Sequence, residues 1–341
     1  MSLNLNNNYV ICPNCKSNRL NSFNDNIVCN NCDEIYPIIY DIPILITKKR
    51  CEELNLNYYS KGLEEKILNS ENIQENEYGI FKYIKKILIG TNGILYENIN
   101  EPKKYPLANI PFSKVDESKE LLLIDIGCGW GRWTLNAAQK GYISVGIDKS
   151  LISLIVAKKI SEQLNIGNCN FICCDVLNLP ISNNSFDRVY SFSFLQHFSE
   201  NNLKTILMKI SEIMKSNSIF KTQMINKYSL RGFYNDFKIK NSKIDMIKKG
   251  RMDSIEGEDS FTVRYFTPNK TLNILKSLFE IDKFENYSFF TQAQIGDFAL
   301  IRFKSKLFMT AAITMNYITK LLPFLKYFSE NYMFTLKKKK L

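Results

Sequence analysis

The fold of this 341-residue chain is decided by the stretch Ile124-Asp125-Ile126-Gly127-Cys128-Gly129-Trp130-Gly131. An apolar run at 121–126, interrupted only by Asp125, leads into three glycines at alternate positions. Such a run is typical of a strand buried on both faces of a parallel sheet. The glycines allow a sharp turn and close approach of a ligand to the backbone, while the following helix directs N–H groups at that ligand. We therefore expect a ligand-binding loop between a buried strand and a helix.

Strand and helix patterns alternate after this loop. They predict strands at 142–147, 170–174, 187–192 and 218–225, separated by helices at 133–140, 151–164 and 203–215. This alternation indicates a parallel sheet with helices on both faces. A helix at 271–279 precedes two closely spaced strands, at 281–290 and 297–303, which predict an antiparallel pair at one edge. The predicted fold class is α/β: a doubly wound, mostly parallel sheet with an antiparallel edge.

Three carboxylates accompany the glycine loop. Asp148 ends the second strand, 21 residues after Gly127, where an acid can accept hydrogen bonds from ribose hydroxyls. That feature alone fits NAD enzymes as well. Asp125 would repel a pyrophosphate and suits a ligand with an ammonium group. Asp175 follows the third strand and can accept from an exocyclic amine such as that of adenine.

Together these residues resemble the class I S-adenosylmethionine-dependent methyltransferases of the small-molecule type. The resemblance is close over about 119–225 and looser to 304, and Lys215-Ser216-Asn217-Ser218 departs from that family's Lys-Pro-Gly-Gly turn. It implies a Rossmann-like fold, S-adenosyl-L-methionine as cofactor and methyl transfer as the activity. A non-enzymatic α/β domain that keeps the pattern is the alternative. The candidate cofactor-binding residues are Asp125, Gly127, Cys128, Gly129, Gly131, Asp148, Lys149, Asp175, Val176 and Ser191.

The acceptor is expected after the fourth strand, at Ser193-Phe194-Leu195-Gln196-His197-Phe198. His197, the one histidine of the chain, is the candidate catalytic residue because imidazole can take a proton near neutral pH. The alternative is a hydrogen-bonded histidine at a helix start with no part in proton transfer. The loop differs from the Asn-Pro-Pro-Tyr type of motif that related enzymes use for planar amides and amines. Methylation of an adenine amine or of glutamine is therefore disfavoured.

Two knuckles near the N-terminus predict a metal site. Cys12-Pro13-Asn14-Cys15 and Cys29-Asn30-Asn31-Cys32 form a CxxC–x13–CxxC pattern. Four thiolates at this spacing bind zinc tetrahedrally and leave no open coordination position, so the pattern predicts a structural Zn²⁺. The candidate ligands are Cys12, Cys15, Cys29 and Cys32. The other five cysteines are interpreted as small buried residues.

Residues 8–47 resemble the small zinc-ribbon proteins that activate methyltransferases acting on tRNA, rRNA or a protein factor. This resemblance supports RNA as a possible partner, as does a formal net charge of +11. The alternative is a ribbon that only packs on the catalytic domain. A third possibility is a non-catalytic protein that activates another methyltransferase.

Composition and patterning suggest a cytoplasmic protein. The start of the chain lacks a secretory signal pattern, and the best apolar stretch, 307–319, is too short to span a membrane. Paired cysteines without an extracellular context favour metal over disulfides. Four lysines at 337–340 are interpreted as a solvated basic end or as a contact for acidic partners.

We divide the chain into a zinc ribbon (1–47), a helical linker on the acceptor side (48–118), the methyltransferase domain (119–304) and an amphipathic basic tail (305–341). Within the third part, the insertion at 226–267 is rich in aromatic and basic residues: Tyr228, Arg231, Phe233, Tyr234, Phe237, Arg251, Arg264, Tyr265 and Phe266. It can form an acceptor lid, stack bases or simply pack the domain. The tail has apolar residues at helical spacing up to Pro323, and either docks on the core or lies on anionic lipid. The leading hypothesis is methylation of a small, sugar- or lipid-linked acceptor, and the alternative is methylation of RNA.

Overall fold

A computed structural model of the chain describes residues 9–91, 99–229, 247–249, 262–264, 266–289 and 295–339. Several residues that the sequence pattern singles out lie outside these ranges: Arg231, Phe233, Tyr234, Phe237, Arg251, Tyr265 and Lys340.

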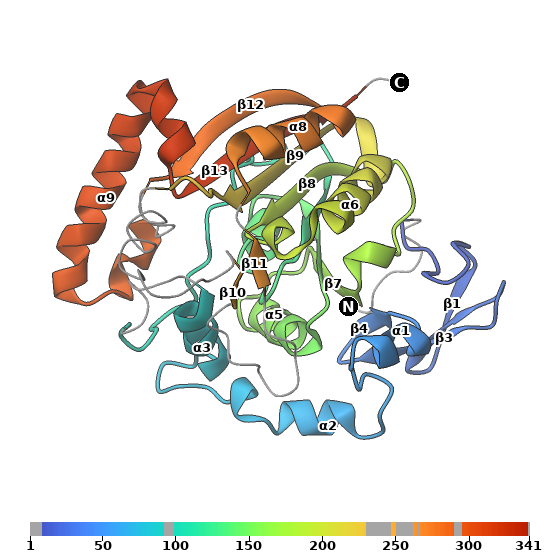
Figure 1. Cartoon of the computed structure of the whole chain (residues 1–341). Coiled ribbons are helices and arrows are strands. Elements are labelled where there is room, and N and C mark those ends of the chain that lie inside the picture. The colour runs from blue at the N-terminus through green and yellow to red at the C-terminus, as the bar shows by residue number, and fades with distance from the viewer. Residues whose placement is uncertain are drawn as a thin grey trace.

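One sheet of eleven described strands forms the centre of the molecule (Figure 1). Its strands are β1 (Leu20–Phe23), β2 (Asn26–Cys29), β3 (Ile35–Ile39), β4 (Ile42–Leu45), β5 (Leu122–Ile126), β6 (Ile143–Asp148), β7 (Cys169–Cys174), β8 (Phe186–Phe192), β9 (Met214–Ile225), β12 (Phe279–Ser288) and β13 (Asn331–Lys338). They are ordered β1-β2-β3-β4-β7-β6-β5-β8-β9-β13-β12. Two further strands, β10 (Ile247–Lys249) and β11 (Thr262–Arg264), pair with each other.

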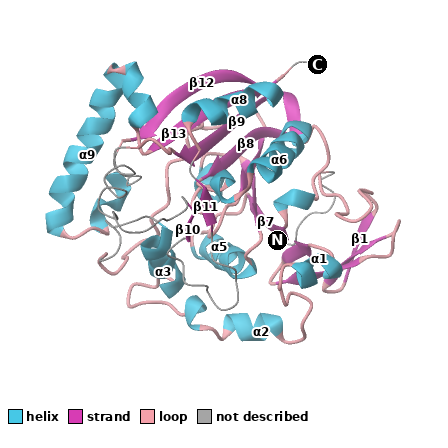
Figure 2. Cartoon of the chain, viewed as in Figure 1, coloured by secondary structure: helices cyan, strands magenta, loops and turns pink. Residues whose placement is uncertain are grey.

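Helices surround this sheet (Figure 2). The described α-helices are α1 (Lys48–Glu53), α2 (Leu63–Leu68), α3 (Lys82–Thr91), α4 (Thr134–Gln139), α5 (Leu151–Gln163), α6 (Glu200–Ile213), α8 (Pro268–Leu278) and α9 (Phe303–Leu321). Short 3-10 helices are η1 (Glu71–Ile73), η3 (Val176–Asn178), η4 (Leu195–His197), η5 (Ile295–Ala299) and η6 (Pro323–Phe328).

The middle of the sheet confirms the predicted doubly wound fold. Strands β7, β6, β5, β8 and β9 are parallel, and β5 alternates its side chains between the two faces. Ile124 belongs to the core that contains α6 and α8, whereas Leu123 packs in the core with Trp133 and Ala137, at the start of and within α4. Helix α5 begins where the sequence predicts, because the Ser150 hydroxyl accepts from the backbone N–H of Ser153 and caps it.

The N-terminal strands extend the same sheet. Strand β4 pairs in parallel with β7, Ile44 opposite Cys173, and the antiparallel strands β3, β2 and β1 continue outward from it. The four-residue β4 is buried along its whole length. The cysteine-bearing segment is therefore joined to the central sheet by main-chain hydrogen bonds as well as by packing.

The other edge of the sheet differs from the prediction. Residues 297–303 are not a strand, because η5 covers 295–299 and α9 begins at Phe303. The strand that pairs with β12 is β13, from the segment predicted to be a basic tail, and it lies between β12 and β9. Tyr332, Phe334 and Leu336 of β13 are buried in the core. The prediction missed this strand because the lysines at its end dominate the composition of the segment that begins at Asn331.

Lysines at the end of this strand have specific partners. The Lys337 ammonium lies 2.5 Å from Asp282, and the Lys338 ammonium donates to the Met214 carbonyl at 2.7 Å. These lysines therefore have partners on neighbouring strands, although the Lys337 side chain is also exposed to solvent. None of the helices in the described ranges has the length and apolar character needed to cross a membrane.

Candidate active site

The three candidate carboxylates lie at the carboxyl ends of neighbouring strands. Asp125 is the penultimate residue of β5, Asp148 is the last residue of β6, and Asp175 directly follows β7. Because β5, β6 and β7 are adjacent and parallel, the three acids share one edge of the sheet. The glycine loop leaves β5 at this same edge, so the fold brings together the residues that the sequence grouped.

Asp148 holds the glycine loop in place. Its Oδ2 accepts from the backbone N–H of Gly129 at 2.9 Å, and its Oδ1 accepts from that of Ser150 at 2.9 Å. Burial raises the pKa of the Asp148 carboxyl, while these two backbone donors act in the opposite direction. Each carboxylate oxygen has a second lone pair, so Asp148 can still accept from a ligand while it orders the loop.

The loop glycines have three different surroundings. Gly127, Gly129 and Gly131 all have positive φ, which suits glycine. A Cβ on Gly127 would lie 2.2 Å from the Phe194 ring, and one on Gly131 would lie 3.0 Å from Ala157. A Cβ on Gly129 would meet nothing within 4 Å. The backbone at Gly129 therefore borders open space, whereas Phe194 covers Gly127.

Asp125 lies beneath the loop rather than on its surface. It is 1% exposed, and its Oδ2 accepts from the Thr134 hydroxyl at 2.7 Å. Burial raises the pKa of the Asp125 carboxyl to about 7, with a smaller contribution in the same direction from Asp148. A positive charge placed nearby would favour the ionised form of this carboxyl. Cys128, also a candidate, is buried beside these acids, and burial raises the pKa of its thiol well above the usual value.

Asp175 has a partner that the sequence did not indicate. Its Oδ2 accepts from Arg50 Nε at 2.8 Å, and its Oδ1 accepts from the Leu177 N–H and thereby caps η3. Arg50 lies on α1, just after the ribbon strands, and also pairs with Glu53 at 2.9 Å. In the sequence Arg50 is only the last of three consecutive basic residues, Lys48-Lys49-Arg50. A contact across 125 residues has no local signal that could have revealed it.

The other candidate cofactor contacts support the strand ends. Ser191 is fully buried and donates its hydroxyl to the Ile126 carbonyl at 3.1 Å. Val176 is buried in the main core, and the Lys149 carbonyl accepts from the Tyr58 hydroxyl at 2.7 Å. In this structure Ser191 and Val176 are therefore buried residues that support the carboxyl ends of the strands from inside the protein.

The candidate acceptor loop after β8 is held in an unusual backbone conformation. Ser193 has φ of 53°, and both its N–H and its hydroxyl donate to Gln223 Oε1, at 2.9 and 2.7 Å. Strained residues held by several contacts often occur at functional loops. His197 follows in η4, half-buried, with its N–H donated to the Phe194 carbonyl at 3.0 Å. The loop thus reaches the glycine loop through Phe194.

A buried ion pair fastens the far side of the glycine loop. Arg132, one residue after Gly131, lies 2.9 Å from Asp297 of η5, and the two side chains are 13% and 1% exposed. Arg132 Nε also donates to the Pro106 carbonyl at 2.9 Å. The sequence did not single out either residue of this pair. It ties the segment before α9 to the carboxyl edge of the sheet.

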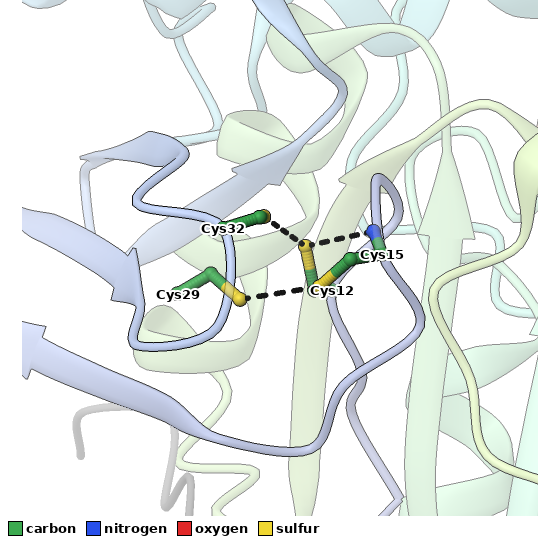
Figure 3. A group of neighbouring side chains, drawn as sticks. All are labelled: Cys12, Cys15, Cys29 and Cys32. Carbon is green, nitrogen blue, oxygen red and sulfur yellow. Dashed lines mark hydrogen bonds between the residues drawn. The ribbon is translucent and has the colours of Figure 1, made fainter.

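The four knuckle cysteines converge as predicted (Figure 3). All four sulfur atoms lie within 4.8 Å of one another, with Cys12 and Cys32 3.7 Å apart and Cys15 and Cys29 3.5 Å apart. Sulfurs that bind one tetrahedral zinc at about 2.3 Å lie about 3.8 Å apart, so the geometry fits that ion. A backbone hydrogen bond from Ser17 is the main cause that lowers the pKa of the Cys15 thiol to about 6, which favours a thiolate ligand.

The first knuckle also touches the segment that follows Asp175. The Pro13 carbonyl accepts from the Asn178 side chain, and the Ile11 N–H donates to the Pro180 carbonyl, each at 3.0 Å. Arg50 binds Asp175 from the other side. Two parts of the N-terminal segment therefore brace the end of β7 and the turn after it.

Comparison with known proteins gives the site a family context. A family model described as a methyltransferase domain matches residues 123–217. An uncharacterised protein of Methanocaldococcus jannaschii is 29% identical over 189 residues, which cover 55% of this chain and 73% of that protein. An O-methyltransferase of Pyrenophora dematioidea is 32% identical over 98 residues, which cover 28% of this chain and 36% of that enzyme.

Solved structures also align with the chain. An S-adenosylmethionine-dependent methyltransferase of Methanosarcina mazei gives a TM-score of 0.45 at 19% identity, covering 66% of this chain and 94% of that one. The magnesium protoporphyrin IX methyltransferase of Synechocystis, solved with bound S-adenosylhomocysteine, gives 0.43 at 15% identity, covering 65% and 76%. The family match at 123–217 spans β5 to the start of β9, including all three acids and the glycine loop. Residues 123–217 therefore match a methyltransferase domain that includes these residues, and the protein is an enzyme.

Proposed function

We propose that S-adenosylmethionine binds along the carboxyl ends of β5, β6 and β7, and that the acceptor lies beside it at the loop after β8. The observation that carries this proposal is the group of three carboxylates on consecutive strands around a glycine loop whose Gly129 borders open space. An anionic, hydrogen-bond-accepting edge suits a cationic adenosyl ligand and is unfavourable for a pyrophosphate.

Each carboxylate has a distinct role in this proposal. Asp148 accepts from the ribose hydroxyls while it orders the glycine loop. Asp175, oriented by Arg50, accepts from the adenine amine with the lone pairs that its present partners leave. Asp125, buried beneath the loop, provides negative charge for the ligand's ammonium. Gly127, Gly129 and Gly131 give the ligand access to the backbone, and Cys128, Lys149, Val176 and Ser191 shape the surrounding edge.

The chemistry needs little from the protein beyond alignment and proton removal. The cofactor supplies a methyl group on a sulfonium, which is a good leaving group. The loop 193–198 aligns the acceptor, and His197 is the candidate to take its proton. Phe194 must move from its place over Gly127 if the ligand is to touch that glycine. Exchange of His197 for Asn distinguishes a base from a residue that only lines the pocket, because only loss of a base removes a pH-dependent step from the rate.

We further propose that residues 1–47 form a ribbon with one structural Zn²⁺ on Cys12, Cys15, Cys29 and Cys32. The sulfur–sulfur distances support this metal. The contact of Pro13 with Asn178, and that of Arg50 on the following helix with Asp175, support a role for the ribbon and α1 in stabilising the adenine side of the cofactor site.

The acceptor that we favour is a small, sugar- or lipid-linked molecule. The loop after β8 lacks the motif expected for base amines, and a matched relative is an O-methyltransferase, which supports oxygen as the acceptor atom. RNA is the second candidate, because the chain carries a net charge of +11 and its ribbon resembles modules that serve RNA methyltransferases. A cytoplasmic location is compatible with both.

Calorimetric titration with S-adenosylmethionine tests the cofactor site. We expect Asp148→Ala to weaken binding about 10- to 100-fold, because the change removes hydrogen bonds to a charged acceptor and releases the loop. Asp116→Ala is the matched control, since this exposed acid lies before β5 at the opposite end of the strand. Equal affinity of both variants and the wild-type chain would refute the proposed site.

Transfer of labelled methyl groups in a cell lysate tests the acceptor. We expect label in the small-molecule or lipid fraction. Label that ribonuclease removes, together with RNA binding that weakens steeply with salt, would instead establish the second candidate.

A further inference from the structure

Helix α9 is attached to the sheet by polar and apolar groups on its inner side, and it also carries large apolar side chains that are exposed. The inward side packs on β12, where Asn316 accepts from the Phe289 N–H and Thr319 accepts from the Asn286 amide, each at 2.5 Å. Met309 on the same side is fully buried. Hydrogen bonds as well as apolar packing thus attach this helix to the sheet.

The outward side carries several large exposed apolar side chains, with Thr310 and Thr314 among them. The largest of these apolar side chains are exposed by 79% at Leu307, 61% at Tyr317, 45% at Ile318 and 79% at Leu321. Every side chain described as exposed between 307 and 322 is uncharged. The surface continues into η6, where Phe324 is 60% exposed. Clustered exposed apolar groups of this kind mark a contact surface, because single exposed apolar residues are common but clusters are not.

The sequence around this surface is wholly cationic. Residues 298–329 contain Arg302, Lys304, Lys306, Lys320 and Lys326, and no Asp or Glu. An apolar stripe in a segment with only positive charges suits an anionic lipid surface, where the apolar groups enter the acyl boundary and the cations meet the headgroups. A second copy of the chain would bring positive segments together, which is electrostatically unfavourable.

We propose that α9 and η6 dock on the surface of an anionic lipid bilayer, with α9 lying in the plane of the interface. Figure 1 shows α9 at the periphery of the molecule, on the side away from β1 and β3, so a flat surface can reach it. The aromatic residues Tyr317 and Phe324 match the interfacial zone of a bilayer. This inference stands on the surface of α9 and does not depend on the identity of the methyl acceptor.

Flotation of the full-length protein with vesicles tests the proposal. We expect binding to vesicles that contain phosphatidylserine, at least about tenfold weaker binding to phosphatidylcholine alone, and weakening by salt. Leu307→Glu with Leu321→Glu should reduce binding by about tenfold or more, because two charges enter the apolar stripe. The control is Met208→Glu on α6, an apolar residue of 49% exposure away from α9, which should bind as the wild type does.

Tryptophan fluorescence provides a second measurement in case the double variant folds poorly. Tryptophan fluorescence of Leu321→Trp should shift to shorter wavelength on phosphatidylserine vesicles, whereas that of Met208→Trp should not. Absence of both flotation and the Leu321→Trp shift would overturn the proposal. The proposal would also be overturned if Met208→Glu lost vesicle binding to the same extent. It would be overturned as well if the wild-type protein did not bind vesicles but formed a dimer, and Leu307→Glu with Leu321→Glu dissociated that dimer.

Discussion

The two edges of the sheet are built in opposite ways. At one edge the beginning of the chain adds β4 in parallel to β7, and short antiparallel strands carry the cysteine knuckles outward. At the other edge β13, from the last part of the sequence, lies between β9 and β12 and runs antiparallel to both. The first edge depends on a cluster of thiols as well as packing, whereas the second depends on large buried side chains. With the proposed Zn²⁺ bound, the sheet would combine local cross-linking where the strands are short with hydrophobic burial where they are long.

The largest effect is expected at the β13 edge. A chain that stops after Glu330 loses Tyr332, Phe334 and Leu336, and β12 loses the strand that it pairs with. Removal of one large buried side chain costs about 2–5 kcal/mol, so loss of three is comparable with the whole stability of a domain, about 5–15 kcal/mol. We expect no cooperative thermal unfolding by circular dichroism. A chain that stops after Lys339 keeps β13 and should melt as the full chain does; equal melting of the shorter chain would show that β13 is dispensable.

The ribbon edge should respond to loss of metal. Cys29→Ser, or chelation, is expected to remove zinc from the protein and to abolish amide-exchange protection over residues 9–47, because binding and folding of such a module are coupled. Protection of β8 and β9 should remain, since these strands lie beyond β5 and β6 from the ribbon. Cys51→Ser is the control, being a buried cysteine outside the cluster. Full protection of 9–47 after complete removal of metal would contradict the proposed structural role.

A smaller effect is expected where the N-terminal segment meets the adenine acid. Arg50→Ala should weaken S-adenosylmethionine binding about 3- to 10-fold, because Asp175 loses the group that orients it. The affinity of Arg50→Lys should lie between those of the wild type and Arg50→Ala, since a lysine keeps the charge but not the planar donor geometry. Glu53→Ala removes the other partner of Arg50 and should leave affinity nearly unchanged. If Glu53→Ala weakened S-adenosylmethionine binding as much as Arg50→Ala, the hydrogen bond from Arg50 to Asp175 would not be the cause of the loss.

The smallest expected effect is the pH dependence of S-adenosylmethionine binding at Asp125, which lies at the centre of the sheet between the two edges. The pKa of Asp125 is raised to about 7, so its carboxyl is largely protonated below that pH. A ligand with a positive charge favours the ionised form, and affinity should therefore rise with pH through about 7, by less than about tenfold per pH unit. Calorimetry at several pH values checks this, and Asp125→Asn should flatten that part of the curve. An unchanged pH dependence in the variant would assign the titration to another group, such as Asp148 or the ligand's amine.

The same carboxyl makes the free enzyme less stable at higher pH. Its pKa is higher in the folded protein than in the unfolded chain, so the unfolded chain loses its proton first as pH rises. The contribution of Asp125 to stability is therefore greatest below about pH 4, falls between about pH 4 and 7, and is level above.

Local patterns in the sequence predicted the centre of the fold and the cysteine knuckles, but not the strand order at the far edge. The strand ending at Ile126, the helix that begins at Leu151 and the cysteine knuckles are each specified within a few residues, and the structure has all of them. Strand β13 was missed because four lysines dominate the composition around it. The strand predicted at 297–303 was wrong because a short apolar run fits a helix start equally well.

The same division applies to the site. The acids and glycines follow strand ends, so periodicity alone places them at one edge. Arg50 with Asp175, Arg132 with Asp297, and Gln223 with Ser193 join segments 30 to 165 residues apart. Such pairs exist only once the chain is folded, and a single sequence contains no sign of them.

The position of β13 also constrains how the protein is made. During synthesis the ribosome releases β12 long before β13, and in the finished sheet β12 hydrogen-bonds to β13. Until residue 338 has emerged, β9 and β12 both present open strand edges, which are sites for pairing with other chains. The nascent protein therefore passes through a stage in which β12 has emerged but the sheet is unfinished, and chaperone protection would be most valuable at that stage.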